Sequence, residues 1–322
     1  MKSPPLDAES RARLEARVPP LHLRRRLGIE ADHEAQIFGQ GRTFFHIENW
    51  YSIHGLIRGL LRLALLHGRG RRNLRRIRLH ENRLSLPTLP PAFEGFRILH
   101  LSDLHLDMAA DLVDVLIERV RGLEHDLCVV TGDLRARTFG RSDPALEAMR
   151  RLRPWLADEV LAVLGNHDSI RMVPALEDMG VQVLLNEHRI IRRADAAIYL
   201  AGIDDPHYYR VDNMERALAG IPAGALSILL AHSPEVYRHA AAVGVDVLFC
   251  GHTHGGQICL PGRVPVLCNA RVPRSLCSGA WRHGNLQGYT SVGSGACVVD
   301  VRLNCPPEVT LHHLCRSDSP PQ

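Results

Sequence analysis

The stretch Cys250-Gly251-His252-Thr253-His254-Gly255-Gly256-Gln257 is the part of the chain from which its fold can be worked out. It follows a short apolar run, residues 245–249, that is typical of a buried strand. Its glycines let the backbone turn sharply and approach a ligand closely. Because imidazole is the commonest side-chain metal ligand, two histidines in a turn at a strand end indicate a metal site, provided that other parts of the chain supply partners.

Four earlier apolar runs end in the same way, with metal-capable polar side chains directly after them. These runs are residues 96–101, 127–130, 160–164 and 226–230. Amphipathic segments typical of helices lie between them at residues 111–123, 144–152 and 172–179. We expect a further strand at residues 181–185 and an antiparallel pair at residues 189–193 and 196–201. Alternating strands and helices predict an α/β fold.

The polar residues at these strand ends form a coherent set of metal donors, and α/β sheets form ligand sites at the carboxyl ends of their strands. The candidate ligands are Asp103, His105, Asp133, Asn166, His232, His252 and His254. Each one alone has an ordinary alternative, such as a turn, a helix cap or a buried core histidine. Together they suit Mn²⁺, Zn²⁺ or Fe, and are too rich in imidazole for Mg²⁺ or Ca²⁺. Seven donors suit two ions that share a carboxylate, an arrangement that promotes phosphoryl displacement.

Two residues beside Asn166 are candidates for catalysis. His167 is not needed as a ligand, and Asp168 follows it. A histidine held by a carboxylate beside the metals is well placed to protonate a leaving oxygen. The nearby residues Arg135, Arg137 and Arg171 either contact substrate phosphate or are simply solvated, and solvation is the interpretation that we favour.

These motifs resemble a known family. Asp103-x-His105, Gly132-Asp133, Gly165-Asn166-His167-Asp168, His232 and Gly251-His252-x-His254 match, in order, the signature of the calcineurin-like metallophosphoesterases over residues 94–315. The resemblance implies a four-layer α-β-β-α sandwich with His167 as the catalytic histidine. It implies a first metal on Asp103, His105, Asp133 and His254, and a second on Asp133, Asn166, His232 and His252. The two histidines of the opening stretch then serve different ions, a separation that an extended chain would provide.

Finer features resemble a bacterial membrane-associated branch that includes the UDP-2,3-diacylglucosamine hydrolases of lipid A synthesis. The similar stretches are residues 251–261, 288–290 and 301–308, together with residues 202–206, whose aspartates either face the cleft or form a structural turn. The resemblance implies hydrolysis of a lipid-linked diphosphate, with two divalent ions, Mn²⁺ by preference. A general or cyclic-nucleotide phosphodiesterase, a nuclease, and a non-catalytic metal-binding scaffold remain alternatives.

Residues 1–90 form a basic N-terminal extension, and residues 316–322 form a short polar tail. Residues 1–96 contain 17 Lys and Arg against 9 Asp and Glu, whereas the rest of the chain has a net charge of −4. Apolar residues at helical spacing predict an amphipathic helix at residues 52–67, capped by Ser52 and ended by Gly68. The arginines at residues 69–83 follow it. Such a segment either lies on an anionic membrane surface or packs on the catalytic domain.

The remaining features concern location and partners. The first 20 residues have no apolar signal-peptide core, and no stretch approaches the ~20 apolar residues that span a bilayer. The eight cysteines contain no Cys-x-x-Cys pair, so we expect reduced thiols. We therefore expect a cytoplasmic protein that is peripheral to the inner face of the cell membrane. Scarce aromatics in the arginine cluster disfavour a nucleic-acid partner, and nothing in the sequence indicates an oligomeric state.

Overall fold

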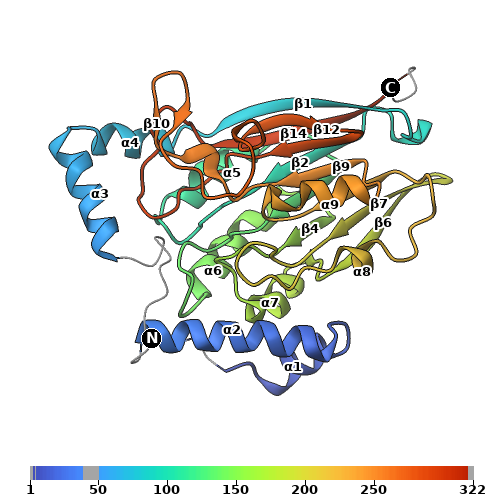
Figure 1. Ribbon diagram of the computed structural model, residues 1–322, viewed down its shortest axis with the longest axis horizontal. Helices are drawn as coiled ribbons and strands as arrows, with labels where there is room; N and C mark the ends of the chain where they lie inside the picture. Colours follow the sequence, from blue (N-terminus) through green and yellow to red (C-terminus); the bar gives the residue numbers. More distant parts are fainter. Residues whose placement is uncertain (1–2, 4, 39–50, 318–322) are drawn as a thin grey trace.

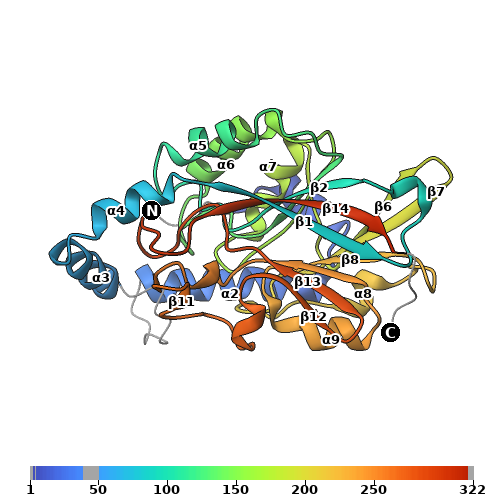
Figure 2. The same ribbon diagram turned by 90° about the horizontal axis from the view of Figure 1, so that it is seen from above.

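Two six-stranded sheets pack face to face, and helices cover the outer face of each sheet (Figure 1, Figure 2). This arrangement is seen in a computed structural model that describes residue 3, residues 5–38 and residues 51–317. The predicted four-layer α-β-β-α sandwich, with a helical N-terminal extension, is therefore confirmed.

The first sheet contains the strands that lead to three of the predicted ligand loops. In spatial order its strands are β1 (Arg78–Leu86), β14 (Glu308–Arg316), β2 (Arg97–Leu101), β3 (Leu127–Thr131), β4 (Val160–Val163) and β5 (Val181–Val183). Strands β2 to β5 are parallel, so their carboxyl ends lie at one edge. The outer face is covered by α5 (Leu112–Val120), α6 (Asp143–Leu152) and α7 (Val173–Asp178).

The second sheet leads to the other two loops. In spatial order its strands are β12 (Gly279–His283), β13 (Leu286–Thr290), β9 (Val247–Cys250), β8 (Ser227–Leu230), β7 (Ala196–Gly202) and β6 (Glu187–Arg193). Strands β6 and β7 are antiparallel, as predicted, while β7, β8, β9 and β13 run parallel. Helices α8 (Met214–Leu218) and α9 (Tyr237–Ala242) cover its outer face, and a small hairpin of β10 (Cys259–Leu260) and β11 (Val264–Pro265) follows β9.

Alternation along the strands places the core between the sheets. In β2, Ile98 faces the second sheet, whereas Leu99 and Leu101 face the helices. Leu230 and Phe249 of the second sheet belong to the same central cluster as Ile98. Burying both faces of the parallel strands explains why they appear in the sequence as continuous apolar runs. The rigid double sheet is what fixes the positions of the loops at its edge.

The N-terminal extension differs in two respects from what the sequence predicted. Its helices are α1 (Ala8–Glu15), α2 (Pro20–Phe38), α3 (Tyr51–Leu63) and α4 (His67–Leu74). The single helix expected at residues 52–67 ends at Leu63, because the chain turns at Leu65 with a φ of 56°, and α4 then runs past Gly68. The side chains of residues 51–54, including the expected cap, lie outside the described residues.

The second difference concerns the end of the extension. Residues 78–86, which the sequence assigned to the extension, form strand β1 and pair with β14 along nine residues. Most of the predicted tail, residues 318–322, lies outside the described part of the chain, and Arg316 closes β14. Within the described residues, no helix is both long enough and apolar enough to cross a membrane.

Strand β1 supplies core side chains, so we expect its disruption to destabilise the whole domain. Leu86 is 1% exposed and belongs to the central cluster. Replacing it in Leu86→Ala should lower the free energy of unfolding by about 2–5 kcal/mol. The adjacent change Ser85→Ala, at an exposed position of the same strand, should alter it by less than about 0.5 kcal/mol. Urea denaturation measures both, and equal stability of the two variants would contradict the inclusion of β1 in the core.

Candidate metal centre

All seven predicted ligands lie in loops that follow strands at the shared edge. Five of them adopt backbone conformations that are uncommon for residues other than glycine. The φ values are 48° for Asp103, 41° for His105, 55° for Asp133, 69° for His252 and 50° for His254. Such strained conformations gather at functional sites, where the surrounding structure enforces them. The loops are thus shaped to present side chains and not merely to connect strands.

Two glycines allow these loops to approach one another. A side chain at Gly251 would clash with Ser102 and with the Asp103 carboxylate. A side chain at Gly165 would clash in the same way with Asp133. The close contact between the loops therefore requires glycine at these positions.

The first group of ligands is brought together as a compact, buried cluster. One donor atom from each of Asp103, His105, Asp133 and His254 lies within 4.8 Å of the other three. The Nδ1 of His105 lies 2.9 Å from the Arg135 carbonyl, so it donates there and leaves Nε2 facing the cluster. Burial lowers the pKa of His105 to about 3, which keeps the ring in the neutral form that binds metals.

The second group also adjoins Asp133. The Nε2 of His232 is 2.9 Å from Asn166 Oδ1 and 3.4 Å from Asp133 Oδ2. The rings of His232 and His252 meet edge to face, with centroids 5.0 Å apart. The Nε2 of His252 is buried and has no hydrogen-bond partner among the described residues. A buried polar atom without a partner is costly, and a metal ion at this point would satisfy it.

His252 and His254 lie in different groups, as expected. The predicted cause, an extended backbone between them, is not what the structure shows. His254 lies with His105, their ring nitrogens 3.1 Å apart, whereas His252 lies with His232. Positive φ values at both histidines, with Thr253 in a helical conformation between them, turn the side chains apart. The extended geometry predicted for this stretch is therefore wrong.

Asp133 connects the two groups. Its Oδ1 accepts a hydrogen bond of 2.9 Å from the backbone N–H of His167, and its Oδ2 faces the rings of His105, His167 and His232. Burial opposes its ionisation, but His232 and the other rings hold the pKa of Asp133 well below its ordinary value. Burial likewise lowers the pKa of His232, but Asp133 more than reverses this and raises it to about 10. This pocket therefore favours a positive charge, which either a proton or a metal ion can supply.

These observations fit two divalent ions. The buried donors are carboxylate, amide and imidazole, and the orphaned nitrogen belongs to the His252 ring, which meets the His232 ring edge to face. The residues that would hold the ions are those predicted from the sequence, with Asp133 shared between the two groups. The donor set includes both hard oxygen and imidazole nitrogen, as Mn²⁺, Fe and Zn²⁺ sites do.

The two candidate catalytic residues have different roles from each other. The His167 ring lies at the edge of the cluster, with Nδ1 2.7 Å from the Ala136 carbonyl and Nε2 3.9 Å from Asp133 Oδ2. Asp168 was expected to hold this ring, but its carboxylate instead accepts hydrogen bonds from the backbone N–H groups of Gly165 and Leu134. Asp168 thus fixes two ligand loops relative to each other, and the carbonyl of Ala136 orients His167.

Three residues near the site were not recognised from the sequence, or were interpreted wrongly. Arg135 is 2% exposed, not solvated, and donates to the carbonyls of His167 and Gly140. Arg302 is fully buried and donates to the carbonyls of His254 and Gly295. Cys297 places its thiol 3.6 Å from Nε2 of His167. No local motif marks these residues, because only the folded chain brings them to the site.

The aspartates of residues 202–206 form a structural turn. Asp205 accepts hydrogen bonds from the backbone N–H groups of Tyr208 and Tyr209, at 2.7 and 2.8 Å. Asp204 pairs with Arg26 and His22 of helix α2. Neither carboxylate joins the metal cluster described above. The interpretation of this stretch as a turn is confirmed.

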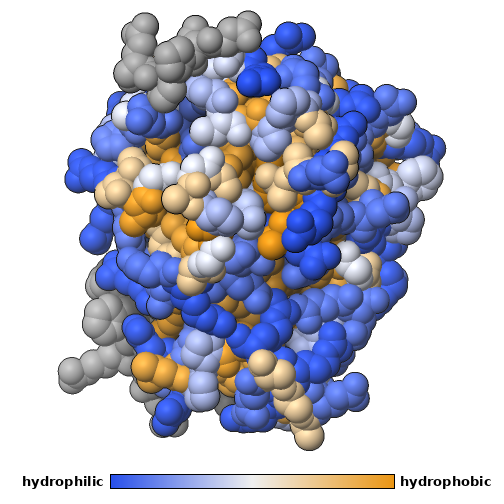
Figure 3. Space-filling view, turned by 90° about the vertical axis from the view of Figure 1, so that its right-hand side faces the viewer, coloured by the Kyte–Doolittle hydropathy of each residue, from blue (hydrophilic) through white to orange (hydrophobic). Residues whose placement is uncertain are grey.

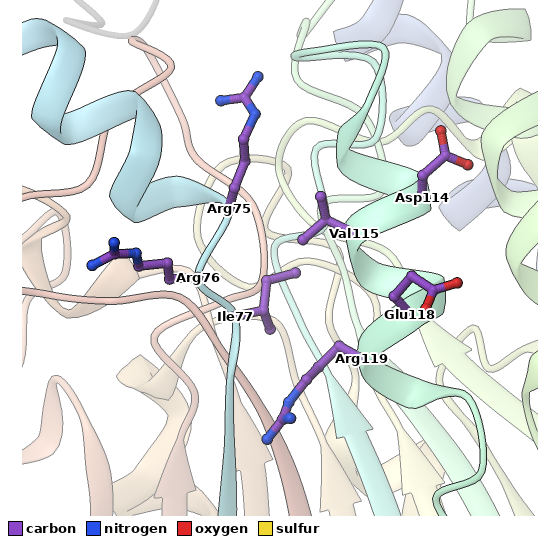
Figure 4. A pocket seen from close by; sticks show the side chains of 7 residues that line it. All are labelled: Arg75, Arg76, Ile77, Asp114, Val115, Glu118 and Arg119. Atoms are coloured by element: carbon purple, nitrogen blue, oxygen red, sulfur yellow. The ribbon is translucent and has the colours of Figure 1, made fainter.

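A shallow groove between the start of β1 and helix α5 is separate from this centre (Figure 4). It is lined by Arg75, Arg76, Ile77, Asp114, Val115, Glu118 and Arg119. Its carboxylates point away from the groove, while Ile77 and Val115 face each other across it. The groove has charges of both signs, and its polar side chains do not converge on one point. We therefore interpret it as the place where the start of β1 packs against α5.

The comparisons with known proteins agree with the site. The sequence model of the calcineurin-like phosphoesterase family matches residues 96–256 of this chain. An uncharacterized metallophosphoesterase of Bacillus subtilis, YkoQ, is 32% identical over 234 residues, which cover 70% of this chain and 85% of that protein. The chain therefore belongs to the calcineurin-like phosphoesterase family, and it is a metal-dependent hydrolase of phosphate esters.

Two further relatives have more descriptive names. The phosphodiesterase YaeI of Escherichia coli is 28% identical over 239 residues, covering 68% of this chain and 82% of its own. A transmembrane protein with a metallophosphoesterase domain from Danio rerio is 28% identical over 241 residues, covering 69% of this chain and 54% of its own.

Metal binding should stabilise the protein, since the ions would bind the folded site and not the unfolded chain. At a metal concentration of 100 times the dissociation constant, the gain is about 2.7 kcal/mol. We expect a higher melting temperature with Mn²⁺ or Zn²⁺ than after chelation, and a smaller increase in His252→Ala. The control His239→Ala alters a side chain that is 44% exposed and should show the full increase. Identical thermal melts with and without metal would contradict the proposed ligands.

Proposed function

We propose that the protein hydrolyses a phosphodiester or diphosphate bond of a lipid-linked substrate at a membrane surface. The substrate that we favour is UDP-2,3-diacylglucosamine, in lipid A type metabolism. The observation that carries the proposal is an apolar surface beside the metal centre. The name of the relative YaeI, a phosphodiesterase, supports cleavage of a bond of this kind.

The apolar surface is formed by helix α3 with the turn after it, and by the β10–β11 hairpin with the residues just after it. It consists of Leu56, Leu60, Leu63, Leu65, Leu260, Val264, Val266 and Leu267. These are eight of the eleven large apolar side chains that are exposed in the described part of the chain, and each is at least 45% exposed. A concentration of this kind marks an interaction site, since single exposed apolar residues are otherwise scattered.

The two parts of this apolar surface adjoin each other and the metal centre. Ile57 and Leu61 of α3 pack in one cluster with Leu303 and with Ile258 at the start of the hairpin. The hairpin follows η6 (His254–Gly256), the turn that carries a predicted ligand. Figures 1 and 2 both show α3 and the hairpin at the same end of the molecule. The opposite end is mostly hydrophilic, with apolar groups scattered over it (Figure 3).

The charge beside the apolar surface favours an anionic membrane. Arg62, Arg69, Arg72 and Arg76 are exposed, and no ion pair joins them to an acidic group within residues 5–38 and 51–317. Each arginine near an anionic leaflet contributes about 1 kcal/mol of attraction. The apolar side chains would enter the interface while the arginines meet the head groups. This supports a peripheral position on the inner face of the cell membrane.

The chemistry that we propose uses the residues of the centre as follows. Bound divalent ions, Mn²⁺ by preference, supply Lewis acidity toward a phosphoryl oxygen and increase the acidity of water. Asp133 holds the two halves of the site together, and Asp168 fixes the loops. His167 donates a hydrogen bond from Nδ1–H to the Ala136 carbonyl, which leaves Nε2 to exchange a proton with the leaving oxygen.

A substrate panel tests this proposal. We expect hydrolysis of bis(p-nitrophenyl) phosphate, and a higher kcat/KM for UDP-2,3-diacylglucosamine in mixed micelles than for UDP-glucose, which lacks acyl chains. His167→Ala should lower kcat by roughly 10²–10⁴-fold with unchanged metal content. Product masses identify the bond that is cleaved. Equal kcat/KM for the two nucleotide sugars would contradict a lipid-linked substrate and favour a general phosphodiesterase.

Binding to vesicles tests the membrane contact separately. We expect the protein to sediment with vesicles that contain phosphatidylglycerol, and Leu63→Asp combined with Val266→Asp to reduce the bound fraction several-fold, because charged residues enter the interface poorly. The control Leu21→Asp replaces a leucine on α2 that is 64% exposed and should leave binding unchanged. All three proteins should hydrolyse the soluble diester equally. Equal sedimentation of the three would contradict this docking surface.

A further inference from the structure

Helix α2 turns an unusual, polar face toward the protein. Leu23, Arg26, Glu30 and His33 are spaced three or four residues apart, so they share one side of the helix. All four are buried, and Arg26 is 0% exposed. Charged side chains are seldom buried unless they are paired. The face must therefore meet specific polar partners.

Arg26 meets the loop that carries Asn166 and His167. Its Nη2 donates a hydrogen bond of 2.7 Å to the carbonyl of Asp168. Its Nη1 lies 3.2 Å from Asp204 Oδ1, in the loop after β7. The guanidinium also stacks 3.3 Å from the centre of the Tyr209 ring, in the same loop. One side chain thus joins loops that follow strands of two different sheets.

Glu30, one turn further along the helix, binds the next residues of the His167 loop. Its carboxylate accepts hydrogen bonds from the Ser169 hydroxyl at 2.6 Å and from the Ile170 N–H at 2.8 Å. It also pairs with Arg171. Arg26 and Glu30 together hold the backbone at residues 168–170, directly after His167.

The end of α2 reaches a third loop. His33 lies 2.9 Å from the Thr138 hydroxyl, in the loop after β3, and 3.0 Å from the Tyr208 hydroxyl. The loop after β3 contains Asp133 and the Ala136 carbonyl that orients His167. The buried face of α2 therefore contacts the loops after β3, β4 and β7, and two of these carry predicted ligands.

We propose that Arg26 and Glu30 are positioning residues of the phosphoesterase, which fix Asn166 and His167 through the backbone of the loop at residues 165–170. The proposal rests on the metal-dependent hydrolysis of phosphate esters and is independent of the lipid substrate. It makes the N-terminal extension a working part of the catalytic centre.

Attachment of the helix alone does not require this face. Leu14 and Val18, which precede this face, already pack in the hydrophobic cluster between the first sheet and its covering helices. Arg13 and Arg17 pair with acidic groups around helix α7, at Glu177, Asp178 and Glu187. These contacts dock α1 and the start of α2 away from the ligand loops. Arg26 and Glu30 add contacts whose effect is on the His167 loop.

The test compares Arg26→Ala and Glu30→Gln with Arg25→Ala, an exposed position on the same helix. Glu30→Gln keeps the size of the side chain and so keeps a folded variant available. With bis(p-nitrophenyl) phosphate, well below the melting temperature, kcat should fall roughly 10–100-fold in both test variants, because small displacements of reacting groups have effects of this size. KM should change much less, and Arg25→Ala should match the wild type.

Calorimetric titration of the metal-free protein with Co²⁺ gives a second readout that does not depend on turnover. We expect two Co²⁺ ions to bind. A looser loop should lower the affinity for the ion that Asn166 would hold by about tenfold or more, and should leave the affinity for the other ion unchanged. A role in folding alone would lower the melting temperature and the active fraction, with normal kcat per folded molecule and normal Co²⁺ affinities. That result, or wild-type kcat and Co²⁺ binding in both test variants, would overturn the proposal. If the wild type failed to hydrolyse the diester, the Co²⁺ titration would still decide it.

Discussion

The site depends on one buried carboxylate, Asp133, surrounded by imidazole rings. Its Oδ2 lies within 3.9 Å of a ring nitrogen of His105, His167 and His232, and its Oδ1 binds the His167 backbone. A lone buried carboxylate would be strongly destabilising. Here the surrounding positive charge, whether of a proton or of metal ions, offsets that desolvation and ties loops from both sheets to one point. This explains why the strained backbone at the ligands is tolerated.

The residues around Asp133 are also buried charged groups that need partners. Asp168 binds the N–H groups of two ligand loops, and its own carbonyl accepts a hydrogen bond from Arg26. Arg26 is in turn neutralised by Asp204 and Glu30. Removing one partner of such a network leaves another charge buried without compensation. The ligand loops and helix α2 thus form a continuous polar network that crosses the edge of the sandwich.

The sequence predicts those parts of the fold and the site that a short stretch of residues marks by its own pattern, and it misses the parts that only the folded chain brings together. Continuous apolar runs that end in metal donors mark the parallel strands and the loops after them, so the sequence alone places Asp103, Asp133 and His232 at the candidate site. Strand β1 was missed because an edge strand with charged residues has no such run. The face of α2 was missed because three of its four buried residues named above are polar, Arg26, Glu30 and His33, and hydrophobic periodicity cannot detect a buried polar face.

The excess positive charge of the N-terminal extension has different explanations in its two parts, one with helices α1 and α2 and the other with helices α3 and α4. Some arginines of α1 and α2, such as Arg13 and Arg26, meet acidic groups of the catalytic domain, at Glu177 and Asp204, so part of their excess charge is balanced within the molecule. Those of α3 and α4 are neutralised only in part, as with Arg71 by Asp300. A basic surface that keeps its charge beside exposed leucines has the composition of a membrane-facing element. The extension therefore combines one part whose buried polar face contacts the loops of the site with another whose arginines and leucines are exposed.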